Sequence, residues 1–222
     1  NTDYFEEGYV GLVCVDRNYV VEELDEENNC LSMTLRAGEN YHFPDVEEGT
    51  IESDATSHLY EEGVIEGYPD GNFYGDNAIN RIEVLKMLLE AQGSRRVVST
   101  YGSHATTLSD LASGQWYSKY VGYAITHDIV SGYPDGSFKP LDTVDTAEFL
   151  KMFSLVYELE LDLSYDYLDV SEDDWFAPYV GLVSEYDLML EEDACTLNPG
   201  RELTRYDVAI ALYQYDMNSG SF

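Results

Sequence analysis

Positive charge is what this sequence has least of. The 222-residue chain has 11 Lys and Arg residues against 44 Asp and Glu residues, which gives a formal net charge of −33. Contacts with nucleic-acid phosphates or anionic lipids require clustered Lys and Arg, so neither is an expected partner. Because 44% of the residues are hydrophobic, we interpret the charge as the solvated surface of a folded protein. The partners that it permits are cations, neutral or cation-bridged glycans, and other copies of the chain.

Long apolar runs and cysteines are also scarce. No run approaches the ~20 residues that a membrane-spanning helix needs, and the chain starts at Asn1 without an initiator Met or a signal peptide. We therefore expect a secreted, mature, extracellular protein with no membrane insertion. In an oxidising compartment, Cys14 and Cys30 could form a disulfide. Cys195 would then be buried or paired between chains.

Recognisable catalytic motifs are missing as well. The sequence has no Gly-x-Ser-x-Gly, no phosphate-binding loop and no dinucleotide fingerprint. Its four histidines are scattered, without helical i, i+4 pairing or a cysteine partner, and 44 acidic residues make chance carboxylate pairs inevitable. We expect a non-enzymatic protein that requires no cofactor.

What the sequence does contain is a repeat. The turn Gly-Tyr-Pro-Asp-Gly occupies residues 67–71 and returns at residues 132–136, a shift of 65. A third copy has lost the turn at residues 191–195. In all three copies an aspartate lies 34 residues before the apolar residue that opens a second helix. These pairs are Asp45 and Ile79, Asp110 and Val144, and Asp169 and Leu203.

Each copy predicts a helix–loop–helix unit. First helices are expected at residues 54–62, 116–127 and 175–186, and a second helix at 145–157. The other two second helices open with capping boxes, Asn80 with Glu83 and Thr204 with Asp207. One unit cannot bury its own apolar face, so we expect a mainly α, pseudo-threefold bundle. The expected division is residues 1–40, 41–106 with a linker, 107–164, 165–217, and a tail at 218–222.

Residues 1–40 lie outside the repeat and predict a short β segment. Residues 9–15 are rich in β-forming residues, 16–18 signal a turn, and 19–21 continue as a second strand. A lone hairpin is marginal in water. It would therefore dock on its own repeat body or add a strand to a neighbouring subunit.

At these residues the chain resembles the S-layer homology (SLH) domain. The family's Phe-x-Asp-Val segment, helix-opening Trp, Gly-Tyr-Pro-Asp-Gly turn and Thr-Arg-Ala-Glu helix start correspond to residues 43–46, Trp116 and Trp175, 132–140 and 204–207. The resemblance implies an all-α pseudo-trimer that attaches non-covalently to a cell-wall polysaccharide in grooves between repeats. It also implies a set of glycan-binding residues. These are Arg81, Arg205, Trp116, Trp175, Gly67, Asp70, Gly132 and Asp135.

Structural roles compete with binding at these positions. Arg81 and Arg205 begin helices, where the dipole does not favour a cation, so they would pair with a carboxylate such as Asp45 or Asp169 or bind a sugar. The tryptophans would pack between repeats or stack on a sugar. Copy two has Thr146 at the Arg position and copy one has Ile51 at the Trp position, so a groove would need groups from two copies.

Calcium and self-assembly complete the expectations. Asp70, Asn72 and Asp76 could present oxygens to Ca²⁺. We expect a self-assembling cell-surface subunit of an S-layer or filament, held together through the N-terminal strands and the repeat body. The alternative is a cell-wall anchoring module that binds a polysaccharide in the inter-repeat grooves.

Overall fold

The computed structural model describes residues 9–14, 30–35, 42–94, 98–101, 108–111, 114–161, 164–191, 193 and 195–219. The chain forms two compact units, Asn1–Asn40 and Tyr41–Phe222. Each unit is described by itself. No helix among the described residues is long and apolar enough to cross a membrane.

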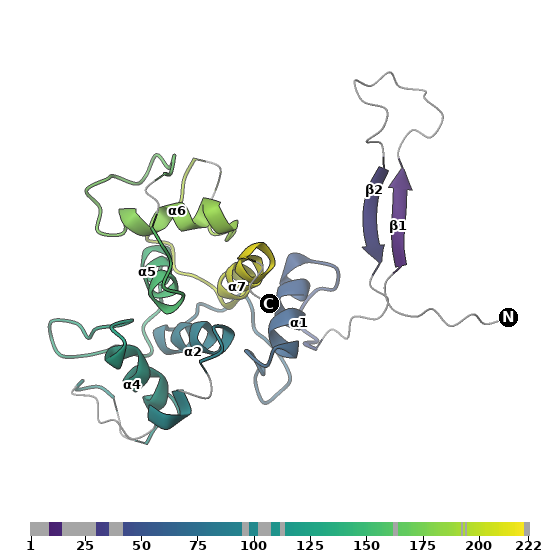
Figure 1. Cartoon of the computed structure of the whole chain (residues 1–222). Helices are drawn as coiled ribbons and strands as arrows, with labels where there is room; N and C mark the ends of the chain where they lie inside the picture. Colours follow the sequence, from purple (N-terminus) through teal and green to yellow (C-terminus); the bar gives the residue numbers. More distant parts are fainter. Residues whose placement is uncertain are drawn as a thin grey trace. The chain divides into compact units, whose positions relative to one another are not determined.

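The first unit holds an antiparallel pair of strands, β1 (Tyr9–Cys14) and β2 (Cys30–Leu35) (Figure 1). The strand expected from residue 9 is confirmed, and it pairs with β2. The second strand expected at residues 19–21 lies outside the described residues. The signal for β2 is the alternation of apolar and polar residues in Cys-Leu-Ser-Met-Thr-Leu. The register makes Cys14 and Cys30 Cα partners. Their disulfide stays a prediction, because the strand side chains lie outside the described residues.

The second unit contains three helix pairs, as the repeat predicts. The pairs are α1 (Ile51–Glu61) with α2 (Arg81–Ala91), α4 (Ser118–Thr126) with α5 (Thr146–Val156), and α6 (Ala177–Tyr186) with α7 (Arg205–Ser219). A 3₁₀ turn, η1 (Ser99–Tyr101), lies between the first two pairs.

The capping residues explain where several helices begin. Asn80 and Glu83 form the expected capping box, and Thr204 and Asp207 exchange the same bonds. Helix α1 begins three residues earlier than expected because Thr50 accepts a hydrogen bond from the backbone of Ser53. Helices α4 and α6 each begin two residues later, so both tryptophans precede their helices.

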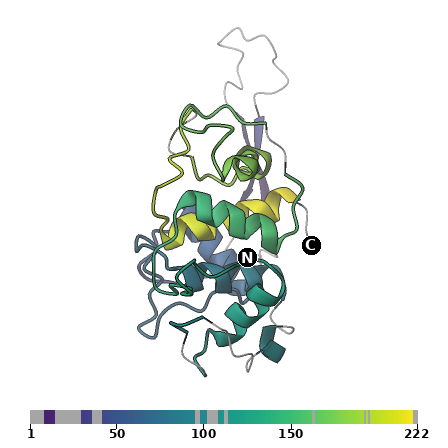
Figure 2. The ribbon, with the colours of Figure 1, turned by 90° about the vertical axis from the view of Figure 1, so that its left-hand side faces the viewer.

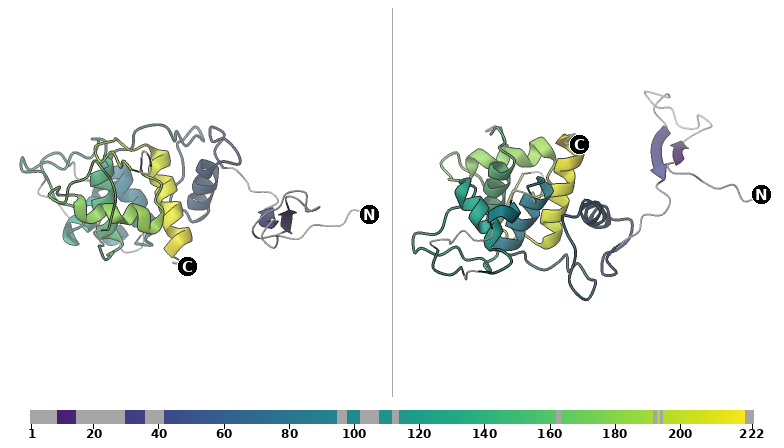
Figure 3. Two further views of the ribbon diagram at one scale, coloured as in Figure 1. Left: turned by 90° about the horizontal axis from the view of Figure 1, so that it is seen from above. Right: turned by 60° about the horizontal axis from the view of Figure 1, so that its bottom comes forward.

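The helices close into a ring. The first helix of each repeat packs on the second helix of the preceding repeat: α4 on α2, α6 on α5, and α1 on α7. Helix α2 also contacts α5 and α7, so the second helices form the centre and the first helices lie outside (Figure 1). Figure 2 shows α5 and α7 running across the middle, with α6 above them in this view. Figure 3 shows α1 beside α7, which joins the two ends of the repeat body.

Backbone hydrogen bonds at the centre follow the same threefold order. The amide of Ile79 donates to the carbonyl of Leu203 (2.9 Å), Leu203 donates to Val144 (2.9 Å), and Val144 donates to Ile79 (3.3 Å). All three side chains are fully buried. These are the apolar residues that open the second helices, so the pseudo-threefold bundle expected from the spacing is confirmed.

The aspartate of each repeat ties that repeat to its own turn. Asp45 accepts hydrogen bonds from the amides of Phe73 (2.8 Å) and Tyr74 (2.7 Å). Asp110 accepts from the amides of residues 138 and 139, and Asp169 from those of residues 197 and 198, at 2.7 to 3.0 Å. The apolar residue held in this way (Phe73, Phe138 or Leu197) is fully buried in each copy. The constant 34-residue spacing therefore corresponds to a loop that is held near one end by the aspartate and at the other by the residue that opens the second helix.

Candidate binding grooves

Two pockets occupy equivalent positions on the ring, and each is lined by residues of three repeats. Groove A, with a volume of about 200 Å³, combines repeat 1 with a tryptophan from repeat 2 and an arginine from repeat 3; it includes Gly67, Tyr68, Glu83, Lys86, Trp116 and Arg205. Groove B, about 270 Å³, is the same set one repeat further on; it includes Gly132, Tyr133, Glu148, Lys151, Trp175 and Arg81. The sequence predicted that a groove would need groups from two copies, but each pocket draws on three. The ring places a helix start of the preceding repeat and the helix-opening Trp of the following repeat at the same opening.

In groove A, Arg205 is held by a hydrogen bond, an ion pair and two aromatic rings. Its Nε donates to the carbonyl of Phe73 (3.0 Å), and its Nη1 lies 3.5 Å from the carboxylate of Glu83. The guanidinium lies over the rings of Tyr68 and Phe73, at 4.9 and 4.7 Å from their centroids. A planar cation fixed in this way is pre-organised to bind a carboxylate or adjacent hydroxyls.

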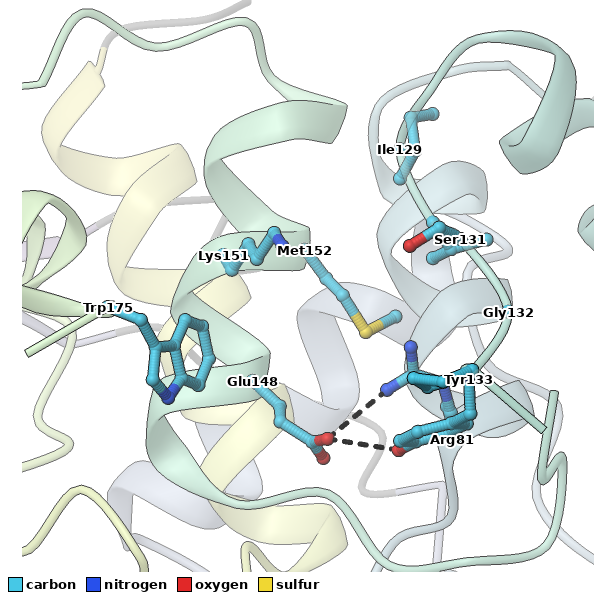
Figure 4. A pocket seen from close by; sticks show the side chains of 11 residues that line it. Arg81, Ile129, Ser131, Gly132, Tyr133, Glu148, Lys151, Met152 and Trp175 are labelled. Carbon is cyan, nitrogen blue, oxygen red and sulfur yellow. Dashed lines mark hydrogen bonds and ion pairs between the residues drawn. The ribbon is translucent and has the colours of Figure 1, made fainter. Parts of the chain in front are cut away.

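Arg81 has a similar environment in groove B, except that its buried Nε lacks the backbone hydrogen bond that Arg205 makes. Its Nη1 is 3.6 Å from Glu148, and its guanidinium lies over the rings of Tyr133 and Phe138 at 5.3 and 5.2 Å. The hydroxyl of Tyr133 donates to Glu148 (3.1 Å), so this carboxylate joins the arginine and the tyrosine (Figure 4).

The carboxylates that pair with the arginines are therefore not the two suggested by the sequence. Asp45 and Asp169 are occupied by backbone amides of their own repeats. Glu83 and Glu148 take their place because the ring brings each arginine to the second helix of a different repeat.

The two tryptophans are exposed at the rims of the grooves. Trp116 is 54% exposed and Trp175 is 56% exposed, which does not fit a role in packing between repeats. In Figure 4, Trp175 lies on the opposite side of Glu148 from Arg81. The ammonium of Lys151 is 5.7 Å from the Trp175 ring. An exposed indole beside fixed cations offers a stacking face together with polar partners, which suits a sugar ring.

Burial raises the pKa of Tyr68 and Tyr133; the neighbouring arginine opposes this shift, and the neighbouring glutamate adds to it. Both hydroxyls donate to the carboxylates of Glu83 (3.2 Å) and Glu148 (3.1 Å). Four of the eleven basic residues of the chain line these two grooves. The positive charge that the surface lacks is thus partly gathered here.

The turn residues contribute to the shape of the grooves. A Cβ atom on Gly67 would lie 2.5 Å from the ring of Phe43, and one on Gly132 would lie 2.3 Å from Leu108. These two glycines therefore allow close packing of the turn on its own repeat. Asp70 and Asp135 are not among the residues lining either groove. Hydrogen bonds lower their pKa values, from Tyr74 and Asn72 to Asp70 and from Ser137 to Asp135.

Two of the predicted calcium ligands, Asp70 and Asn72, are hydrogen-bonded to each other. Asp70 accepts hydrogen bonds from Asn72 and Tyr74 within the turn. In the part of the chain that the structure describes, no group of three or more His, Cys, Asp or Glu side chains is arranged to hold a metal ion. The calcium site at Asp70, Asn72 and Asp76 stays a prediction.

The three departures of this chain from the repeat pattern all fall at one place, the third position of the ring. By analogy with grooves A and B, helix α7 would there lie near a tryptophan that precedes α1 and an arginine that begins α5. The chain has Ile51 and Thr146 instead, and the missing turn at residues 191–195 belongs to the same position. Departures that are scattered along the sequence thus fall at one position of the ring, which lacks both the tryptophan and the arginine, and they leave the full set of groups at grooves A and B.

At this third position, an arginine from within repeat 3 pairs with the carboxylate. Nη1 of Arg201 donates to both carboxylate oxygens of Asp207 (3.1 Å each), and its Nη2 donates to the carbonyl of Leu190 (3.2 Å). Asp207 is the counterpart of Glu83 and Glu148. The backbone amide of Thr146 donates to the Arg201 carbonyl at 3.1 Å. Arg201 therefore neutralises the carboxylate that Thr146 cannot.

Sequence reasoning found six of the groove residues and missed the others. Lys86 and Lys151 recur at the 65-residue shift, as do Glu83 and Glu148, so comparison of the copies could have found all four. Arg201 has no basic counterpart in the other copies, and its role depends on the three-dimensional arrangement.

Comparison with known proteins agrees with this geometry. The model of the S-layer homology domain matches residues 42–85 and 107–150. The chain is 35% identical over 98 residues to the "Surface layer protein" of Brevibacillus choshinensis, which is 43% of this chain and 9% of that protein. It is 27% identical over 112 residues to the "Cellulosome-anchoring protein" of Acetivibrio thermocellus, which is 50% of this chain and 25% of that protein. The chain thus spans a quarter or less of the length of these relatives.

Proposed function

We propose that the protein is a non-enzymatic anchoring module of the cell surface, because residues 42–85 and 107–150 match the model of the S-layer homology domain. It holds a cell-wall polysaccharide non-covalently in grooves A and B. The observation that carries the proposal is that each groove assembles a fixed arginine, a lysine and an exposed tryptophan from three different repeats.

The chemistry of the grooves favours a sugar with an acidic group. The arginine offers parallel N–H donors to a carboxylate, the lysine offers a mobile ammonium, and the tryptophan offers an apolar face. Hydroxyl groups on the same ring would find the tyrosine and glutamate at the base of the pocket. The name of the relative in Acetivibrio thermocellus, an anchoring protein, supports the same proposal.

Tryptophan variants test this proposal, because Trp116 and Trp175 are more than half exposed and their removal should leave the fold intact. Trp116→Ala disables groove A, Trp175→Ala disables groove B, and the double variant disables both. Binding of the purified chain to protein-free cell walls of Brevibacillus choshinensis is measured by co-sedimentation. Walls from which the polysaccharide has been extracted serve as the blank.

We expect each single variant to bind at least several-fold more weakly and the double variant to stay in the supernatant, because truncating a tryptophan that anchors a ligand costs about 2 kcal/mol or more. Leu168→Ala is the matched control, since Leu168 is 84% exposed and lines neither groove. Retention of the double variant at the level of Leu168→Ala would refute the proposal. Arg81→Ala and Arg205→Ala then test the polar contacts.

Self-assembly into an S-layer or filament is the second candidate. It is supported by the match to a surface layer protein and by the strand pair of the first unit, which could pair with another copy. Negative-stain microscopy of the full chain, with Ca²⁺ and with chelator, tests it. Ordered sheets or filaments would support this candidate, and a monodisperse monomer under both conditions would contradict it.

A further inference from the structure

The ring closes where repeat 3 meets repeat 1, and this junction differs from the other two in one pair of facing residues. At each junction, the second residue of a second helix donates its backbone N–H to a loop carbonyl of the next repeat around the ring. The pairs are Ile82 with Pro140 (3.1 Å), Ala147 with Pro199 (3.0 Å) and Tyr206 with Gly75 (2.9 Å). Two junctions thus place a proline opposite an aliphatic residue, whereas the closing junction places a glycine opposite a tyrosine.

The tyrosine ring occupies the space that a side chain at residue 75 would need. A Cβ atom on Gly75 would lie 2.1 Å from Cζ of Tyr206 and 2.2 and 2.3 Å from its two Cε atoms. Non-bonded carbon atoms pack at about 3.5–4.0 Å, so any residue other than glycine would have to displace the ring. The prolines at the same place in the other two loops both carry this atom.

The same ring is packed against other groups of repeat 1. Its centroid lies 5.6 Å from that of the fully buried Phe73 ring. Burial raises the pKa of Tyr206 to about 12, with a further contribution from the carboxylates of Asp45, Asp76 and Glu52. All four of these neighbours belong to repeat 1, although the tyrosine belongs to repeat 3. Moving the ring away from residue 75 would therefore break its other contacts with repeat 1.

We infer that Gly75 and Tyr206 determine which repeat closes the ring: the start of α7 accepts the loop of repeat 1 and rejects the loops of repeats 2 and 3. The rejection is steric, because Pro140 and Pro199 would each bring a Cβ atom into the tyrosine ring. It applies equally to repeats 2 and 3 of a second copy of the chain, so these related surfaces cannot replace repeat 1. The inference concerns the assembly of the repeat body and does not depend on what the grooves bind.

Helix α1 gives a local readout of closure, because it packs on α7. Amide hydrogen exchange of the full-length protein, measured by mass spectrometry of its peptides, reports how often each helix opens. Gly75→Ala should speed exchange in α1 roughly 5- to 140-fold, which is the usual cost of overpacking converted to an opening equilibrium. Exchange in α4, which packs on α2, should stay at the wild-type rate.

A tyrosine variant separates the contact of this pair from a general loosening. Tyr206→Ala removes the packing of the ring and should speed exchange in α1 by itself. In that background Gly75→Ala should cause no further increase, because the atoms that the new Cβ would meet are gone. Gly200→Ala is the matched control: a Cβ there meets no atom within 4 Å, and it should change exchange in neither background.

An equal increase from Gly75→Ala in the wild-type and Tyr206→Ala backgrounds would overturn the inference, because the cost would then not come from this pair. A wild-type rate for α1 in Gly75→Ala would also overturn it, because the junction would then tolerate a side chain at residue 75. If Gly75→Ala does not fold, recovery of the fold in the double variant supports the inference, and failure of the double variant overturns it.

Discussion

Replacing Asp45 by alanine tests whether the repeated aspartates hold the body together. The carboxylate accepts hydrogen bonds from the amides of Phe73 (2.8 Å) and Tyr74 (2.7 Å), 28 and 29 residues away. Hydrogen bonds to charged groups contribute about 1.5–3 kcal/mol each, and because Asp45 is exposed we take the lower limit for both, a total of about 3 kcal/mol. For a domain of this size, that loss lowers the melting temperature by roughly 6–12 °C.

The assay is thermal unfolding of the full chain, followed by circular dichroism of the helices. Asp45→Asn should fall between the wild type and Asp45→Ala, because an amide keeps one acceptor oxygen and loses the charge. Asp70→Ala is the matched control: Asp70 is an exposed aspartate that closes only its own turn, at 3.1 Å from the amide of Asn72. If Asp45→Ala melts with Asp70→Ala at the temperature of the wild type, the tether does not stabilise the fold and the 34-residue spacing needs another explanation.

Two further substitutions test the Arg201–Asp207 pair at the third position of the ring and the half-buried cap of α5. Arg201→Ala leaves the half-buried carboxylate of Asp207 without its bidentate partner; it should cost about 1–3 kcal/mol of unfolding free energy and leave cell-wall binding unchanged, and weaker binding would show that the third position is functional. Burial raises the pKa of Asp145, which caps α5 through the amide of Glu148 (2.8 Å), so its ionisation opposes folding increasingly as pH rises above about 4. Asp145→Asn keeps the cap, as Asn80 does in repeat 1, and should melt at or above the wild-type temperature at pH 7 with a smaller difference at pH 3; a lower melting temperature at pH 7 would contradict the assigned cost.

The sequence was sufficient for the fold because the repeat encodes it locally. Three features recur at fixed spacings, namely the aspartate tether, the capping boxes, and the apolar residues Ile79, Val144 and Leu203. Each spacing corresponds either to a contact within one repeat or to the hydrogen-bonded threefold centre. Strand β2 follows an acidic stretch of the sequence, and its sequence signal is an alternation of apolar and polar residues over only six positions. It belongs to the first unit, so the architecture of the repeat body does not depend on it.

The grooves were harder to predict because no repeat contains one. Arg205, Trp116 and Glu83 are separated by up to 122 positions in the chain and meet only because α1 closes the ring against α7. Each single copy therefore contains an incomplete set of groove residues. Around the ring the same residues form two complete grooves and a third position that lacks the tryptophan and the arginine. The order in which the repeats follow one another around the ring is the information that the single copies lack.

The acidity of the chain does not conflict with an acidic ligand once the positions of the charges are known. In ~0.1 M salt, exposed charges more than about 10 Å apart are largely screened, so most of the net charge of −33 acts weakly on a sugar in a groove. Arg81 and Arg205 act at contact distance, about 90% buried and backed by aromatic rings, where screening is least effective. At the third position Thr146 removes the arginine, and the carboxylate left behind has acquired Arg201. Local neutralisation of that carboxylate is therefore kept even where the arginine at the helix start is absent, which indicates that the pairing stabilises the fold in addition to the part that Arg81 and Arg205 take in binding.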